Sequence, residues 1–266
     1  MNNRNHLPTE LIVQIFSLLI AFIIVHSIYI SVIRPEADSF LQQEHEMMLA
    51  DTSYVQKRNF YVVVRDYEQE ACFILMLWAL SIMTFKGFSS WQQNKLLDKD
   101  ILKIPYDMPI APEDTKSLLQ KLNELPNNIQ YYLIPRALKM AVQRFAATQN
   151  VHDAHTAMRD TCESEAQRLD TELSIIRYIA WAIPSVGFIG TVRGIGDALS
   201  QANRAMEGDI TGVTQSLGVA FNSTFIALVI SIVLMFFIHQ LQLRQERLIL
   251  DSENYCDQNL ISRLRN

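Results

Sequence analysis

Four apolar stretches interrupt an otherwise polar chain, and they set the expected architecture. The first, Leu11–Ile33, has 23 residues and no formal charge, enough to cross a hydrocarbon core about 30 Å thick at about 1.5 Å per residue. The second, Ala71–Phe85, is short for a span, so we extend it to residue 88, because a snorkelling lysine and an interfacial tryptophan follow. The other two are Ile175–Leu199 and Leu217–Ile238. The pattern predicts an all-α membrane protein with four transmembrane helices.

The polar segments between these stretches are also expected to be helical. Residues 39–64 contain no Gly or Pro, and a capped helix is predicted to begin near Pro112. Two further helical runs are expected at about 129–148 and 153–173. The second of them meets no Gly or Pro before the third apolar stretch. We therefore expect two long helices, because the third and fourth spans both continue into a helical domain.

Basic residues set the expected topology. With the N-terminus inside, and with Lys86 at the inner end of the second span included, the inner side holds sixteen Lys or Arg and the outer segments five, which fits the positive-inside rule. The expected segments are then an inner N-terminus (1–10), the first span (11–33), an outer loop (34–70), the second span (71–88), an inner helical domain (89–173), the third span (174–199), a second outer loop (200–213), the fourth span (214–239) and an inner C-terminal helix (240–266).

Composition narrows the classes of function. The net charge is −5, and the three cysteines form no disulfide framework, because their number is odd and none lies in an outer loop. The sequence contains no phosphate loop, no nucleophile elbow and no cysteine-rich metal signature. We therefore expect a protein that is not an enzyme, has no metal or cofactor and has no nucleic-acid partner.

Seven of the eight glycines lie between Gly187 and Gly218, inside or next to the third and fourth spans. Gly costs about 1 kcal/mol relative to Ala in a helix interior, whereas in membranes small residues let helices approach closely. Gly190 and Gly194 form a GxxxG pair. A second small face consists of Gly187, Thr191, Gly194 and Ala198. The glycines alone fit simple packing within the bundle as well as they fit a functional site.

The fourth span also contains the polar run Asn222, Ser223 and Thr224. Polar residues at membrane depth usually face a bundle interior or a water-filled path. Thr191 and Thr224 lie eight and seven residues from the outer ends of their spans, so their hydroxyls are expected at similar depths, roughly 10–12 Å from the outer boundary. A polar layer shared by two helices favours an ion path. The alternative is that both threonines only bond their own i−4 carbonyls.

Two motifs resemble a known family at this point. The stretch "PSVGFIGTVRGIGDAL" resembles the P-x-x-G-x-x-G-T-V-x-G-I motif of the MotA/TolQ/ExbB family of ion-channel stator subunits, and "LGVAFNSTFIALVISI" resembles its second pore-helix motif. The resemblance covers residues 173–240 closely and the first span and outer loop only loosely. The matching positions are Pro184, Gly187, Gly190, Thr191, Val192, Gly194 and Ile195 in the first motif, and Ala220 and Thr224 in the second.

The resemblance implies a subunit of the bacterial inner membrane with both termini in the cytoplasm. It implies a homo-oligomeric ring, typically a pentamer, around the helices of a single-pass partner similar to MotB, TolR or ExbD. That partner supplies a proton-accepting Asp, and ion flow, of H⁺ above all, drives force or rotation. The residues agree on one point independently, because no span has a carboxylate near its middle and threonine cannot titrate. If protons move, the acid comes from another chain.

Arg193 departs from the family pattern, which often has an apolar or aromatic residue there. It lies roughly 9 Å from the outer end of its span, and Asp197 at i+4 is close enough in helical spacing to pair with it. One interpretation is a structural charge pair. The other is a positive ring at the outer mouth that repels cations until an acidic segment of the partner neutralises it.

Two alternative functions remain open. A transmembrane sensory protein would share the span, outer loop and span plan of residues 11–88, and its ligand would contact the loop 34–70. A transporter is less well supported, because the sequence has no pair of interrupted spans in matching halves. The sensory alternative leaves the cluster of glycines and threonines unexplained.

Overall fold

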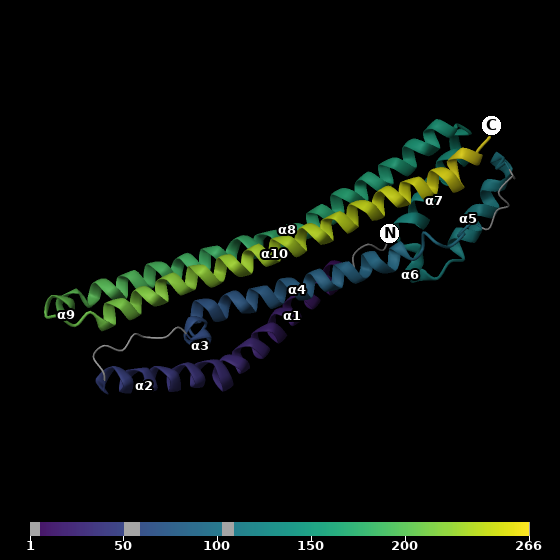
Figure 1. The fold of residues 1–266 in the computed structure, drawn as a ribbon. Coiled ribbons are helices and arrows are strands. Elements are labelled where there is room, and N and C mark those ends of the chain that lie inside the picture. Colours follow the sequence, from purple (N-terminus) through teal and green to yellow (C-terminus); the bar gives the residue numbers. More distant parts are fainter. Residues whose placement is uncertain (1–5, 51–58, 103–108, 266) are drawn as a thin grey trace. The chain divides into compact units, whose positions relative to one another are not determined.

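The computed structural model describes residues 6–50, 59–102 and 109–265, and these residues form helices and no strand (Figure 1). The longer helices are α1 (His6–Ile28), α2 (Arg34–Ala50), α4 (Tyr67–Asn94), α7 (Leu133–Thr148), α8 (Val151–Ser200) and α10 (Thr211–Asn259). The shorter ones are a π turn η1 (Tyr29–Ile33), α3 (Phe60–Val63), the 3-10 turn η2 (Pro112–Asp114), α5 (Thr115–Asn123), α6 (Asn127–Gln130), α9 (Ala202–Met206) and the 3-10 turn η3 (Ile261–Arg263).

The chain divides into two compact units. The first contains the residues up to Met83 together with Ile175–Ile238, and the second contains Thr84–Ser174 and His239–Asn266. The division falls inside α4, α8 and α10, so each of these helices contributes to both units.

Within the part of the chain that the structure describes, four helical stretches are long and apolar enough to cross a membrane: Leu11–Met48, Tyr67–Asn94, Val151–Ser200 and Thr211–Arg263. Their number agrees with the four apolar stretches of the sequence. Their bounds are wider, because each helix continues into neighbouring polar residues. The first stretch is extended most, since the helix persists through the π turn η1 and α2 to Ala50, where the polar residues were expected to be helical.

Pro184 lies inside α8 and leaves the helix unbroken. A proline in a helix cannot donate to the carbonyl four residues earlier, which here belongs to Ala180. The structure satisfies this carbonyl from the neighbouring helix, because the Ser231 hydroxyl of α10 donates to it at 3.0 Å. In a membrane such a replacement matters, because no water is present to bond the freed oxygen.

Small side chains fill the helix contacts of the first unit. Ala21, Ala79, Ala220 and Ala227 are all buried, which lets neighbouring backbones approach closely. The large apolar side chains of α1 point outward instead: Leu11, Ile12, Phe16, Phe22 and Ile23 are all exposed. This inversion of the pattern of a soluble protein suits a surface that lipid covers.

The second unit has an ordinary hydrophobic core. It is built from α5, α7, the beginning of α8 and the end of α10, and its fully buried members include Leu138, Phe145, Met158, Cys256 and Leu260. The end of the chain closes this core, because the Ile110 backbone N–H donates to the Arg263 carbonyl at 2.9 Å and the Arg265 N–H donates to the Ile110 carbonyl at 3.1 Å. The buried carboxylate of Glu165 is paired with Arg136 at 2.9 Å and with Arg168 at 2.6 Å.

Candidate functional site

Helices α8 and α10 run side by side (Figure 1). At three glycines of α8 the backbones of the two helices approach each other closely. A Cβ atom added at Gly187, Gly190 or Gly194 would have an atom of α10 at 2.5–2.7 Å. Real Cβ atoms do not approach other atoms this closely. The nearest α10 side-chain atoms belong to Ala227, Ser223 and Ala220 respectively. These three glycines therefore have a steric role in helix packing.

Thr191 and Thr224 lie in this contact, and their hydroxyl groups are hydrogen-bonded to each other. The Thr191 Oγ1 is also 3.1 Å from the Ala220 carbonyl oxygen and 3.3 Å from that of Gly187. The Thr224 Oγ1 is 3.2 Å from the Gly187 carbonyl of the other helix rather than bonded to its own i−4 carbonyl. The threonines therefore form one polar layer that joins two helices.

The hydrogen bonds of this pair are not all compatible at one moment. Each hydroxyl has one proton and two lone pairs. Two protons face three acceptors, namely the two carbonyl oxygens and the other hydroxyl. At any time one threonine donates to the other, which donates to a carbonyl. The pair keeps spare acceptor capacity, and either hydroxyl can be turned to donate to an added oxygen.

The other two polar residues of the run lie away from this pair. Ser223 is 1 % exposed and faces α4: it donates to the Val219 carbonyl at 2.9 Å, and Gln69 Nε2 lies 3.4 Å from its Oγ. Asn222 lines a cavity on another side of α10. The sequence grouped the three residues because they are adjacent, but successive residues of a helix point about 100° apart.

Arg193 binds Glu68 of α4 in a bidentate ion pair, with Nε–Oε1 and Nη2–Oε2 distances of 2.7 and 2.8 Å. The carboxylates of Asp197 and Asp66 are farther from the guanidinium, at 3.8 and 4.0 Å. Asp197 is therefore a second contact, and Glu68 is the main one. The sequence analysis missed Glu68, because it lies 125 residues away and helical spacing detects partners only within one helix.

A second polar cluster surrounds Glu70, which is 6 % exposed. His26 Nδ1 lies 2.6 Å from its Oε1, and Arg34 forms an ion pair with its Oε2. The π turn η1 lies between His26 and Arg34 and accommodates an extra residue in one helical turn. Eight residues of regular α-helix would rotate the two side chains by about 80° from one another. The wider turn removes most of this offset, so both reach the same carboxylate.

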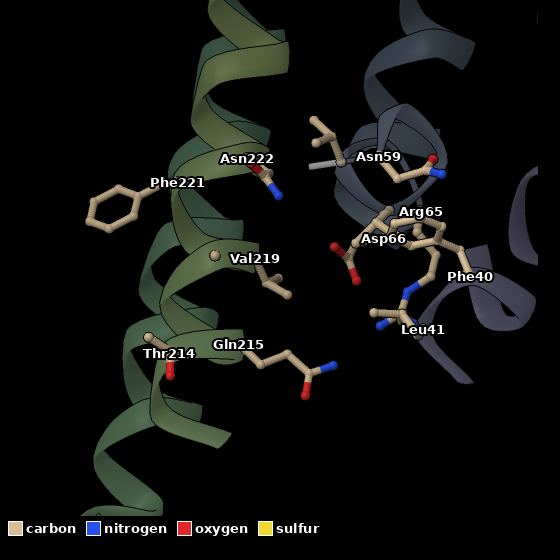
Figure 2. Close-up of a pocket in the computed structure, with 13 residues that line it drawn as sticks. Phe40, Leu41, Asn59, Arg65, Asp66, Thr214, Gln215, Val219, Phe221 and Asn222 are labelled. Atoms are coloured by element: carbon tan, nitrogen blue, oxygen red, sulfur yellow. The ribbon is translucent and has the colours of Figure 1, made fainter. Parts of the chain in front are cut away.

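A cavity of about 290 Å³ lies between α10 on one side and α2, α3 and the residues Arg65 and Asp66 on the other. Figure 2 shows Gln215, Val219 and Asn222 on the α10 side, with Asp66 and Arg65 opposite. Burial raises the pKa of the Asp66 carboxyl above its ordinary value, and the nearby Arg65 and Arg193 offset this only in part. The amide, carboxylate and guanidinium lining suits water.

No group of three or more metal-binding side chains occurs in the described ranges 6–50, 59–102 and 109–265. The site therefore consists of hydroxyl groups and backbone carbonyls between two small-residue helix faces, bordered by ion pairs from α4. Such a layer can hold and orient a proton donor, a proton acceptor or water. Without a titratable group it cannot take up a proton itself.

Comparison with known proteins identifies the family. Residues 129–254 match the family model described as the MotA/TolQ/ExbB proton channel family. The match contains Thr191, Thr224 and the three packing glycines, whereas α1 to α4 lie outside it. Comparisons with curated proteins and with solved structures gave no match. Both halves of the threonine layer fall within the matched range, and this match over just under half of the chain supports its membership of the MotA/TolQ/ExbB proton channel family.

Proposed function

We propose that this protein is a proton-channel subunit of an energy-transducing stator complex in a bacterial inner membrane. Members of its family are channel-type subunits of such complexes rather than enzymes. The observation that supports a proton path in this chain is the hydrogen-bonded pair of Thr191 and Thr224 between α8 and α10. The sensory alternative, with a ligand at residues 34–70, is not favoured by the family match.

The proton acceptor is proposed to come from a partner. The apolar parts of α8 and α10 contain no carboxylate near their middle, and a threonine hydroxyl does not titrate in the physiological range. A single-span protein similar to MotB, TolR or ExbD would supply an Asp at the depth of the threonine layer. An ionised carboxylate there needs hydrogen-bond donors, because charges at membrane depth are costly.

The threonine pair is suited to this task. In the absence of a partner, one hydroxyl donates to the other and the second donates to a carbonyl. One of the two hydroxyls would turn to donate a hydrogen bond to an Asp carboxylate of the partner. This hydrogen bond would stabilise the ionised form of the Asp. Once the Asp is protonated, that donor is no longer needed and the hydroxyls return to each other. The ionised and the protonated Asp of the partner thus differ by one hydrogen bond to the threonine pair. This difference changes how strongly the partner is held, and proton flow can therefore drive its movement.

A homo-oligomeric ring, typically five subunits in this family, would bring several such layers around the partner. The outward surfaces of α8 and α10 support an assembly in the membrane, because their exposed side chains are large and apolar: Trp181, Phe188, Val192 and Leu199 on α8, and Phe221, Phe225 and Ile232 on α10. In this arrangement residues 34–70 face the periplasm, and the second unit and both termini lie in the cytoplasm.

The proposal is tested by proton flux into vesicles that contain the chain and a MotB-, TolR- or ExbD-like protein from the same genome. Thr191→Val and Thr224→Val keep the side-chain volume but remove the hydroxyl. We expect each to reduce flux to the background of empty vesicles while the oligomer still assembles. Ser185→Ala, which removes an exposed hydroxyl bonded to its own helix, is the matched control and should leave flux unchanged. Normal flux through the double threonine variant would disprove the proposed role of the pair.

A further inference from the structure

Two consecutive residues at the start of α4, Glu68 and Gln69, contact both helices of the threonine pair. Glu68 pairs with Arg193, two residues after Thr191. The Gln69 side-chain amide lies 3.4 Å from the hydroxyl of Ser223, the residue before Thr224. The contacts on α8 and α10 are thus each within two residues of the threonine on that helix.

The three helices meet at Gly190 without spare room. A Cβ atom at Gly190 would lie 2.5 Å from Ser223 Cβ and 3.1 Å from Glu68 Cγ. Any movement of α4 at this level therefore pushes on α8 and α10 together, or opens a gap beside both. Packed interfaces respond to such changes in discrete steps rather than by smooth deformation.

The ion pair fixes direction as well as distance. The planar guanidinium of Arg193 meets the carboxylate of Glu68 through two parallel bonds, a geometry that allows little rotation. Glu68 is largely buried, with 11 % of its side chain exposed. If Arg193 were lost, a carboxylate would be left without its main partner at the membrane boundary, where unpaired charge is costly. The pair therefore holds α8 at one rotation relative to α4.

Gln69 supplies the second point of attachment. Its side chain is completely buried, and its Nε2 lies within hydrogen-bond distance of both the Val63 carbonyl, at 3.2 Å, and the Ser223 hydroxyl. A buried amide is costly to place in an apolar bundle. Leucine would fill the same space at lower cost if packing were its only role. The bridge instead joins α10 to the end of α3.

We propose that Glu68 and Gln69 are positioning residues, which set the rotation and separation of α8 and α10 at the threonine pair and so determine whether the pair conducts. This inference rests on the proposed channel function only for its consequence for flux. The outer end of α4 lies outside the range that matches the family, whereas the threonine pair lies inside it. The inference is that the first controls the geometry of the second.

The geometry is tested first without ion flux. In a chain whose three native cysteines are replaced by alanine, Thr191→Cys and Thr224→Cys place two thiols where the hydroxyls meet, and the rate of disulfide formation under a mild oxidant reports their juxtaposition. We expect Glu68→Gln and Gln69→Met each to slow this rate about tenfold, the effect of a misalignment of about 1.4 kcal/mol. The charge exchange Glu68→Arg with Arg193→Glu should restore it. Glu36→Gln, on the exposed face of α2, is the matched control and should have no effect.

The second measurement is proton flux with the partner, in chains that retain both threonines. We expect Glu68→Gln to lower flux about tenfold while native mass spectrometry shows an unchanged oligomer, and the charge exchange to recover flux. Unchanged cross-linking and flux in an assembled Glu68→Gln oligomer would overturn the inference. If that variant does not assemble, the charge exchange decides: an assembled double variant that restores neither readout also overturns it. Absence of flux in the unmodified complex would refute the proposed function, and the cross-linking rates would still decide the inference.

Discussion

At the scale of a single residue, the surroundings of Asp66 change the pKa of its carboxyl group. Its carboxylate lines the cavity beside α10, and its distance to Arg193 is too long for a hydrogen bond. Desolvation by burial raises its pKa, and the nearby arginines compensate incompletely. Glu68, two residues later, has the bidentate partner that Asp66 lacks. The two acids thus differ by environment rather than by chemistry.

A pH dependence of stability follows from this raised pKa. Between the ordinary Asp pKa, about 3.9, and the raised folded value, the folded state binds more protons than the unfolded state, so stability falls as the pH rises through this window. We expect Asp66→Asn to be more stable than the unmodified protein near neutral pH, and this advantage to disappear as the pH approaches the ordinary value. Thermal unfolding in detergent at both ends of the window measures the difference. A constant difference across the window would mean that Asp66 does not titrate there.

The residues of the site were only partly accessible from the sequence. Counting residues from the ends of two apolar stretches placed Thr191 and Thr224 at one depth, because a helix has a fixed rise. The structure brings their hydroxyls together. Glu68 could not be found in this way. Its pairing with Arg193 depends on how α4 is rotated about its axis relative to α8. Neither the hydrophobic periodicity nor the charge pattern of the sequence predicts that rotation.

At the scale of a helix, the glycines of α8 have two different roles. Gly190 is enclosed by Ser223 and Glu68, whereas no atom lies within 4 Å of a Cβ placed at Gly196. The first is needed for close packing, and the second only lowers helix propensity. Because both lie in the same helix, they allow a matched comparison.

We expect Gly190→Ala to destabilise the protein by about 1–3 kcal/mol, the usual cost of overpacking. Gly196→Ala should be neutral or stabilising by up to about 1 kcal/mol, because alanine favours the helix. Thermal unfolding of the two variants in the same detergent measures both effects. Equal losses in the two variants would show that the contact at Gly190 is not as tight as described.

The π turn η1 is a feature of this scale that the sequence did not predict. Hydropathy ended the first apolar stretch at Ile33, and the polar residues after it were expected to be largely helical; the helix does continue through Tyr29–Ile33 into α2. The local sequence "YISVI" has no residue that signals a π turn. The turn is explained by a tertiary contact, because it brings both His26 and Arg34 to Glu70. The number of apolar helices was predictable, but this change of register was not.

At the scale of the molecule, the exposed apolar faces of α8 and α10 require a cover. Lipid covers some of this surface in any membrane protein, but exposed Phe221 and Phe225 lie on α10 next to the threonine layer. We expect native mass spectrometry of the detergent-solubilised protein to show a closed oligomer, five subunits by analogy with the family. A stable monomer as the sole species would contradict the ring and remove the main support for a shared pore.

The closure of the second unit by the end of α10 and η3 has a consequence for biosynthesis. Four buried members of this core come from the end of the chain, whereas its other buried members lie before residue 163; the four are Cys256, Leu260, Ile261 and Leu264. Ile110 also pairs with Arg263 and Arg265 through backbone hydrogen bonds. A ribosome translates all four apolar helices before it reaches these residues. The core of the second unit is therefore complete only when the last residues of the chain are present. A chain truncated before residue 256 would leave exposed the apolar side chains that these residues cover.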